Sequence, residues 1–173
     1  QKGWCESWGL SAEDVDWLTP HEPDYQSYYN EYVALKSTFD PVDFDPQAWA
    51  RLARDAGMRY FVFTTKHHDG FCMFDTKQTP YRITDPGCPF HDDPRANITR
   101  HLFDAFRAQG LRVGAYFSKP DWNVPWYWSP KWQHATRNVN YRPKARPEIW
   151  RKFCDFTYAQ IEELCTDYGP LDI

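Results

Sequence analysis

The 173-residue sequence is short of glycine and has no long apolar run, and both shortages exclude whole classes of protein. A membrane-spanning helix is indicated by about 18 consecutive apolar residues, and no stretch of the sequence is that long. Glycine, at 8 residues, is outnumbered by proline, at 14, and nothing in the chain repeats, so collagen-like and low-complexity structures are excluded. The sequence therefore predicts neither a membrane span nor a fibrous chain.

Several motifs of well-known chemistry are missing as well. The five cysteines include no Cys-x-x-Cys pair, which leaves zinc-ribbon and thioredoxin-type sites without support. Their odd number and irregular spacing favour mostly buried thiols over a disulfide framework. The sequence has no glycine-rich phosphate loop, no Gly-x-Ser-x-Gly and no His-Glu-x-x-His, so nothing supports phosphoryl transfer, serine hydrolase or zincin chemistry.

Charge and aromatic content narrow the class further. The net charge is −4 and the pI is near 5.8, which argues against a nucleic-acid partner because backbone recognition needs clustered Lys and Arg. Aromatic residues make up 18% of the chain, and rings in this number can bury a sizeable core. The composition predicts a globular protein and excludes global disorder.

Three segments carry helix signals, and a strand-like run follows each one closely. Asp45-Pro46 predicts the start of the first helix, Asn97 caps the second, and the third runs from about Glu148 to Tyr168. The strand-like runs lack clean alternation, as expected of strands covered on both faces. They are residues 60–65, 111–117 and 171–173. This order predicts parallel strands joined by helices, and hence an α/β fold.

Helical spacing also predicts which side chains of the first two helices face the core. In the first helix these are Trp49, Leu52, Ala53 and Ala56, and in the second Ile98, Leu102, Phe103 and Phe106.

Polar and aromatic residues gather where the first two strands end, at the edge that carries the chemistry in α/β proteins. Lys66-His67-His68-Asp69-Gly70-Phe71 follows the first strand. Adjacent residues of a strand point to opposite faces, which argues against a shared metal. Past the strand end the backbone turns, so both rings can line a rim and bind hydroxyls. The alternative is one structural and one exposed histidine.

The second strand ends in Tyr116-Phe117 and is followed by an aromatic run at Trp122, Trp126, Tyr127 and Trp128. Aromatic faces with polar neighbours suit a sugar, which has an apolar face and a rim of hydroxyls. The alternative for each of these rings is a packed aromatic core.

The residues that follow the two strands resemble those of a known family. The run from Thr64 to Lys77, with His67-His68-Asp69-Gly70-Phe71 inside it, is similar to the signature of family 29 glycoside hydrolases, the α-L-fucosidases. The resemblance covers the chain from about Trp4 onward. The flanking segments that agree are Phe39-Asp40-Pro41, residues 44–50, 104–107 and 116–119, Asp121-Trp122 and residues 166–170.

The resemblance implies a (β/α)8 TIM-like catalytic barrel, of which this chain supplies roughly strands 2 to 4. It implies retaining hydrolysis of terminal α-L-fucose from glycans or glycoconjugates, with one carboxylate as nucleophile and another as acid and then base. Both carboxylates are expected beyond Ile173, so no catalytic residue, cofactor or metal is expected within the chain. We expect residues 1–173 to be a fragment of one catalytic barrel domain, truncated at both ends and inactive alone.

The resemblance assigns the substrate-binding residues one at a time. His67 and His68 match the family pair that holds sugar hydroxyls, and Tyr116 matches the strand-end tyrosine. Glu6 and Trp8 are the best local candidates for the family's Glu-Trp contact.

Two positions depart from the family pattern. Pro80 stands where an acidic residue is expected, and Asn123 stands where a histidine is expected. An asparagine keeps the hydrogen bonding but does not titrate near neutral pH.

Two other interpretations stay open. A non-catalytic fucose-binding protein on the same barrel would use the same pocket residues without the carboxylates. A metal-dependent barrel hydrolase is disfavoured by the adjacency of the two histidines. Members of the family are typically secreted, periplasmic or lysosomal.

Overall fold

The computed structural model describes residues 25–128, 139 and 141–173, and the chain divides into two compact units. The loop unit is formed by the described part of Gln1–Leu35 together with His67–Gly70 and Ser118–Thr157. The sheet unit is formed by Lys36–Lys66, Phe71–Phe117 and Tyr158–Ile173.

The sheet unit is built on two parallel strands, β1 (Tyr60–Lys66) and β2 (Arg112–Phe117). Their register runs from Tyr60 opposite Arg112 to Thr64 opposite Tyr116, with an irregularity before Lys66. Residues 171–173 continue the pattern beside β2, because Asp172 N donates to Val113 O (2.8 Å) and Ala115 N donates to Ile173 O (3.0 Å). The parallel α/β arrangement predicted from the sequence is confirmed.

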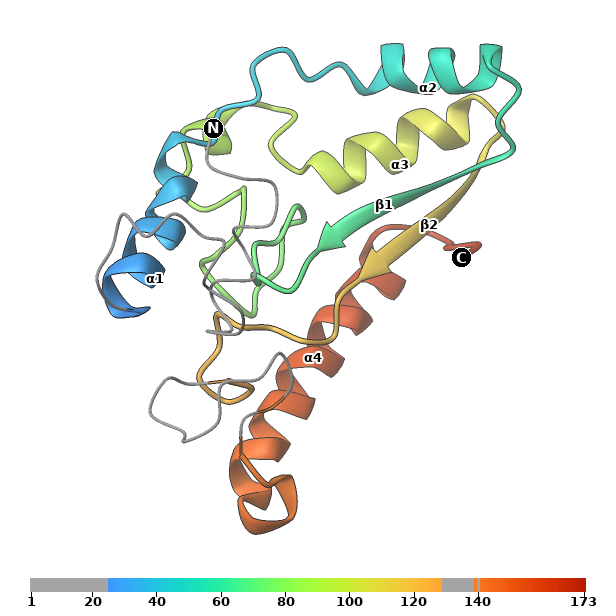
Figure 1. The fold of residues 1–173 in the computed structure, drawn as a ribbon. Helices are drawn as coiled ribbons and strands as arrows, with labels where there is room; N and C mark the ends of the chain where they lie inside the picture. The colour runs from blue at the N-terminus through green and yellow to red at the C-terminus, as the bar shows by residue number, and fades with distance from the viewer. Residues whose placement is uncertain (1–24, 129–138, 140) are drawn as a thin grey trace. The chain divides into compact units, whose positions relative to one another are not determined.

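The helices of the sheet unit begin at the predicted caps. α2 (Pro46–Asp55) starts after Asp45, whose side chain accepts from Ala48 N at 2.8 Å. α3 (Ile98–Ala108) starts after Asn97, whose side chain accepts from Arg100 N at 3.3 Å. A side-chain cap of this kind contributes about 1 kcal/mol to helix stability. In Figure 1, α3 lies alongside β1 and β2, and α2 packs against α3.

The described residues also form the long helix α4 and short 3-10 helices. α4 spans Pro147–Asp167, close to the predicted third helix, and its part from Tyr158 onward belongs to the sheet unit. The 3-10 turns are η3 (Leu35–Thr38), η4 (Pro89–Asp92) and η5 (Pro143–Ala145).

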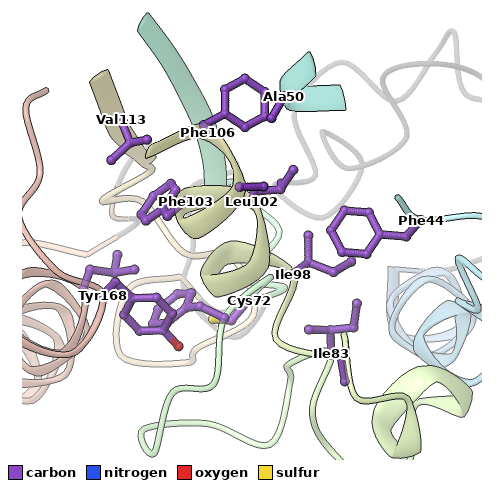
Figure 2. Close-up of a cluster of buried hydrophobic side chains, with 14 of the residues drawn as sticks. Phe44, Ala50, Cys72, Ile83, Ile98, Leu102, Phe103, Phe106, Val113 and Tyr168 are labelled. Atoms are coloured by element: carbon purple, nitrogen blue, oxygen red, sulfur yellow. The ribbon is translucent and has the colours of Figure 1, made fainter. Parts of the chain in front are cut away.

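The core of the sheet unit lies between α3, the strands and the loop that follows β1 (Figure 2). The predicted face of α3 is confirmed, since Ile98, Leu102, Phe103 and Phe106 are all buried. Phe61 of β1 stacks on Phe106 with a 3.9 Å centroid separation. Burying a side chain of this size contributes about 1.5–3 kcal/mol, so α3 is the helix that holds the strands in place.

Two expectations about burial are wrong. In α2, Trp49 is 50% and Leu52 72% exposed, and the buried side chains are Pro46, Ala50 and Ala53, because small residues face α3 at close range. The strands are not covered on both faces within this unit: Val62 is 40% exposed. α3 packs on the strand face that carries Phe61, and side chains alternate between faces, so Val62 lies on the opposite one.

The thiols also differ in part from the expectation. Cys72 and Cys88 are buried, but Cys154 and Cys165 are exposed on α4, and none of these four described thiols is in a disulfide. Burial raises the pKa of the Cys88 thiol. Cys5 lies outside the described residues.

The loop unit contains α1 (Tyr25–Ala34) and the first part of α4 around a second aromatic core. The rings of Tyr127 and Phe153 lie 4.7 Å apart. The buried members of this core are Trp122, Val124, Tyr127, Trp128, Phe153 and Phe156. For Trp122, Tyr127 and Trp128 the interpretation as packed core is therefore the right one.

Candidate functional site

The two predicted histidines lie in a tight turn directly after β1. Gly70 N donates to His67 O at 3.0 Å, which closes the turn, and Gly70 has a φ of 83°. Both histidines are half-buried, and their rings lie 4.4 Å apart. The chain turns as soon as β1 ends, so the two imidazoles lie side by side instead of on opposite faces.

The segment Asp121–Asn123, which follows β2 in the chain, packs directly on this turn. Trp122 N donates to His68 O at 2.8 Å, and the His68 and Trp122 rings lie 5.2 Å apart. Asp121 is 1% exposed, and its Oδ1 accepts from Asn123 N at 3.0 Å. The buried indole of Trp122 therefore forms an apolar wall beside the His68 ring.

Gly70 allows the two segments to approach this closely. A Cβ atom at this position would lie 2.5 Å from Asp121 Oδ1 and 2.9 Å from Asn123 Cβ. Both distances are too short for non-bonded atoms, and a φ of 83° is itself unfavourable for residues with a side chain. Glycine is required here for two independent reasons.

Two tyrosines of α1 that were not predicted from the sequence complete the site. Tyr32 Oη donates to Asp69 Oδ2 at 3.0 Å, and Tyr29 Oη donates to Asn123 Oδ1 at 2.5 Å. Burial and the nearby charge of Asp121 raise the pKa of Tyr29. The i, i+3 spacing of the tyrosines, which places both on one helix face, was the available signal.

The other residues singled out from the sequence belong to the sheet unit or lie outside the described residues. Tyr116 is 43% exposed near the end of β2 and belongs to the sheet unit, where Thr65 Oγ1 donates to its carbonyl oxygen at 2.9 Å. Glu6 and Trp8 lie outside the described residues. Pro80 is exposed, and its carbonyl accepts from Lys36 Nζ at 3.2 Å.

A buried polar row lies at the end of β1 within the sheet unit. Lys66, Gln160 and Cys72 are each 0% exposed. Lys66 Nζ donates to Gln160 Oε1 at 3.2 Å and lies 4.4 Å from the centroid of the Phe117 ring, and Gln160 Nε2 donates to Cys72 Sγ at 3.4 Å. These contacts offset part of the cost of burying the Lys66 side-chain nitrogen. Gln160 was detectable as a polar residue at helical spacing from the apolar Phe153, Phe156 and Leu164 of α4.

The comparison with family models decides the family. The α-L-fucosidase model matches residues 1–173, the whole of the chain. This chain belongs to the α-L-fucosidase family.

Curated members and solved structures of the α-L-fucosidase family agree with this assignment. The tissue α-L-fucosidase of Bos taurus is 27% identical over 152 residues, which are 83% of this chain and 31% of that protein. The α-L-fucosidase structure from Bacteroides thetaiotaomicron has a TM-score of 0.70 and 30% identity, over 83% of this chain and 29% of that one. Isoenzyme 1 from Paenibacillus thiaminolyticus has a TM-score of 0.66 and 38% identity, over 95% and 35%. This chain spans about a third of the length of these fucosidases.

The described part of the chain carries neither a metal cluster nor a membrane span. Within residues 25–128, 139 and 141–173, no group of three or more His, Cys, Asp or Glu side chains is placed to hold a metal ion. No helix of the same residues is long and apolar enough to cross a membrane.

Proposed function

We propose that the protein to which this chain belongs is a retaining α-L-fucosidase that removes terminal α-L-fucose from glycans or glycoconjugates. Family membership supports this activity. A second structure of the Bacteroides enzyme, 29% identical with a TM-score of 0.67, is a covalent intermediate formed with 2-fluoro-fucosyl fluoride. A covalent glycosyl-enzyme is the intermediate of a retaining mechanism, which supports retention here.

The observation that carries the proposal is the pair of half-buried imidazoles in the turn after β1. Each ring can donate one hydrogen bond and accept another, which suits two neighbouring hydroxyls of one sugar. The buried Trp122 beside His68 excludes water on that side, and hydrogen bonds are stronger in such a site. We assign fucose binding to His67 and His68, with Tyr116, Glu6 and Trp8 as further contacts.

We further propose that the chain supplies strands 2 to 4 of a (β/α)8 barrel and is one part of its catalytic domain. β1, β2 and residues 171–173 would be these strands. Their parallel order and helical connections support this assignment. The nucleophile and the acid/base residue would lie outside the 173 residues, so the isolated chain is expected to bind fucose weakly and to hydrolyse nothing.

The test uses the full-length protein with 4-nitrophenyl α-L-fucoside. The expected result is release of nitrophenol, with kcat/KM lowered about 100-fold by His68→Ala, because hydrogen bonds to a sugar hydroxyl that strengthen in the transition state are worth several kcal/mol. The matched control is His101→Ala in α3, which removes a histidine of the sheet unit whose ring is hydrogen-bonded to the Pro94 carbonyl at 2.8 Å. Unchanged kinetics in His68→Ala would contradict the assigned role.

Other outcomes identify the alternatives. Binding of free fucose without hydrolysis of any fucoside would indicate a fucose-binding protein on the same fold. Loss of activity with a chelator, restored by metal, would indicate a metal-dependent hydrolase. Hydrolysis of another glycoside in place of fucosides would overturn the proposed substrate.

A further inference from the structure

α1 connects the two segments that form the candidate site. Tyr32 reaches Asp69 in the turn after β1, and Tyr29 reaches Asn123 in the segment after β2. Residues three apart lie on one helix face, so a single helix makes both contacts at once. Since each hydroxyl is carried by a rigid ring, the contacts fix distances as well as directions.

Both segments lie outside the regular ladder of the strands, in the loops that follow β1 and β2. Gly70 N to His67 O closes the turn, and Trp122 N to His68 O joins the two segments. A loop that must order itself on binding loses affinity through the entropy of ordering. A helix that orders it beforehand therefore improves binding of any ligand held by the histidines.

We propose that α1 is a clasp, in which Tyr29 and Tyr32 are positioning residues that hold His67 and His68 in the arrangement that binds fucose. The inference rests on the proposed function, because it explains why the residues proposed to bind fucose are held in a fixed arrangement. The tyrosines touch the residues next to the histidines and are not assigned a contact with the sugar.

The chemistry of the two contacts suits a stable link between α1 and the two loop segments. A carboxylate accepts the Tyr32 hydroxyl and an amide oxygen accepts the Tyr29 hydroxyl, so both phenols act as donors. Burial and the charge of Asp121 raise the pKa of Tyr29, which keeps its proton in place over the physiological range. Both rings also pack against the aromatic core of the loop unit, which fixes α1 itself.

The experiment removes each hydroxyl and keeps its ring. In the full-length protein, Tyr32→Phe and Tyr29→Phe are each expected to weaken binding of free fucose, and Tyr32→Phe about 10-fold because its acceptor is charged. The matched control is Tyr158→Phe on α4, where the ring is 68% exposed. This control is expected to bind fucose as the parent does. Unchanged fucose binding in both clasp variants would overturn the proposal.

A double-mutant cycle separates positioning from general stabilisation. If Tyr32 acts through the histidine pair, the loss of fucose binding caused by Tyr32→Phe becomes smaller once His68 is alanine. If its role is only structural, the two losses add, and that result would also overturn the proposal.

Hydrogen exchange gives a readout that needs no activity. The amides of Gly70 and Trp122 are expected to exchange faster in Tyr32→Phe than in the parent or in Tyr158→Phe. Faster exchange in a protein that neither binds nor hydrolyses fucosides would refute the proposed function. It would still support the positioning role of α1. Unchanged exchange would refute the clasp, whatever the activity.

Discussion

Replacing Gly70 with alanine tests whether the close approach of the two strand-end segments is a requirement of the fold. The new Cβ would lie 2.5 Å from Asp121 Oδ1 and 2.9 Å from Asn123 Cβ. Asp121 is 1% exposed and its Oδ1 is already hydrogen-bonded to the chain, so it has little room to move. The turn or the Asp121–Asn123 segment must shift to accept the methyl group.

Two costs add in this variant. A left-handed backbone costs a residue with a side chain about 1 kcal/mol relative to glycine. Overpacking by one methyl group in a tight site adds about 2 kcal/mol. We expect Gly70→Ala to lower the free energy of unfolding by about 3 kcal/mol. Because the shift displaces the histidine turn, we also expect weaker binding of fucose.

Gly57→Ala is the matched control, because Gly57 has a φ of 77° and a Cβ added there would meet no atom of the described residues within 4 Å. This variant has the backbone cost without the overpacking, so we expect the free energy of unfolding to fall by about 1 kcal/mol. Chemical denaturation of the full-length protein gives both values. Equal losses in the two variants would show that the segments do not meet as described, and the site built on their contact would be refuted.

Three further predictions concern the sheet unit. Gly114→Ala is expected to lower the free energy of unfolding, measured by chemical denaturation, by about 1–3 kcal/mol. The reason is that the added Cβ would lie 2.7 Å from the Ile173 Cβ. Lys66→Ala is expected to cost about 3 kcal/mol in the same assay, since it empties a wholly buried position; a loss no larger than that of an exposed lysine would contradict this. Burial alone raises the pKa of Asp85, but the hydrogen bonds from Lys36 and the Gly87 amide, together with the charges of Lys36 and Arg82, outweigh it and lower the pKa below its usual value. Asp85→Asn is therefore expected to lower stability at neutral pH, and the difference from the parent should vanish in strong acid, once the pH falls below that lowered pKa.

The elements that sequence reasoning predicted are those with local signals. Asp45 and Asn97 cap helices within three residues of their own position, and the residues of α3 repeat at helical spacing, so each signal lies inside a short window. The exposed Trp49 and Leu52 show where local periodicity fails. The periodic pattern shows which residues of α2 share a helix face. It does not show that the small Ala50 and Ala53 form the contact with α3, which leaves Trp49 and Leu52 exposed.

The candidate site depends on contacts that no local window contains. His67 and His68 could be selected because they directly follow a strand, but the contact between Tyr29 and Asn123 joins residues 94 positions apart, and Tyr32 and Asp69 are 37 apart. α1 itself is rich in tyrosine, a residue of only moderate helix propensity, so it carried little evidence of a helix. A tyrosine on such a segment is informative only when its acceptor is known. For this reason the two histidines could be selected from the sequence, whereas the residues that we propose to hold them in place required the structure.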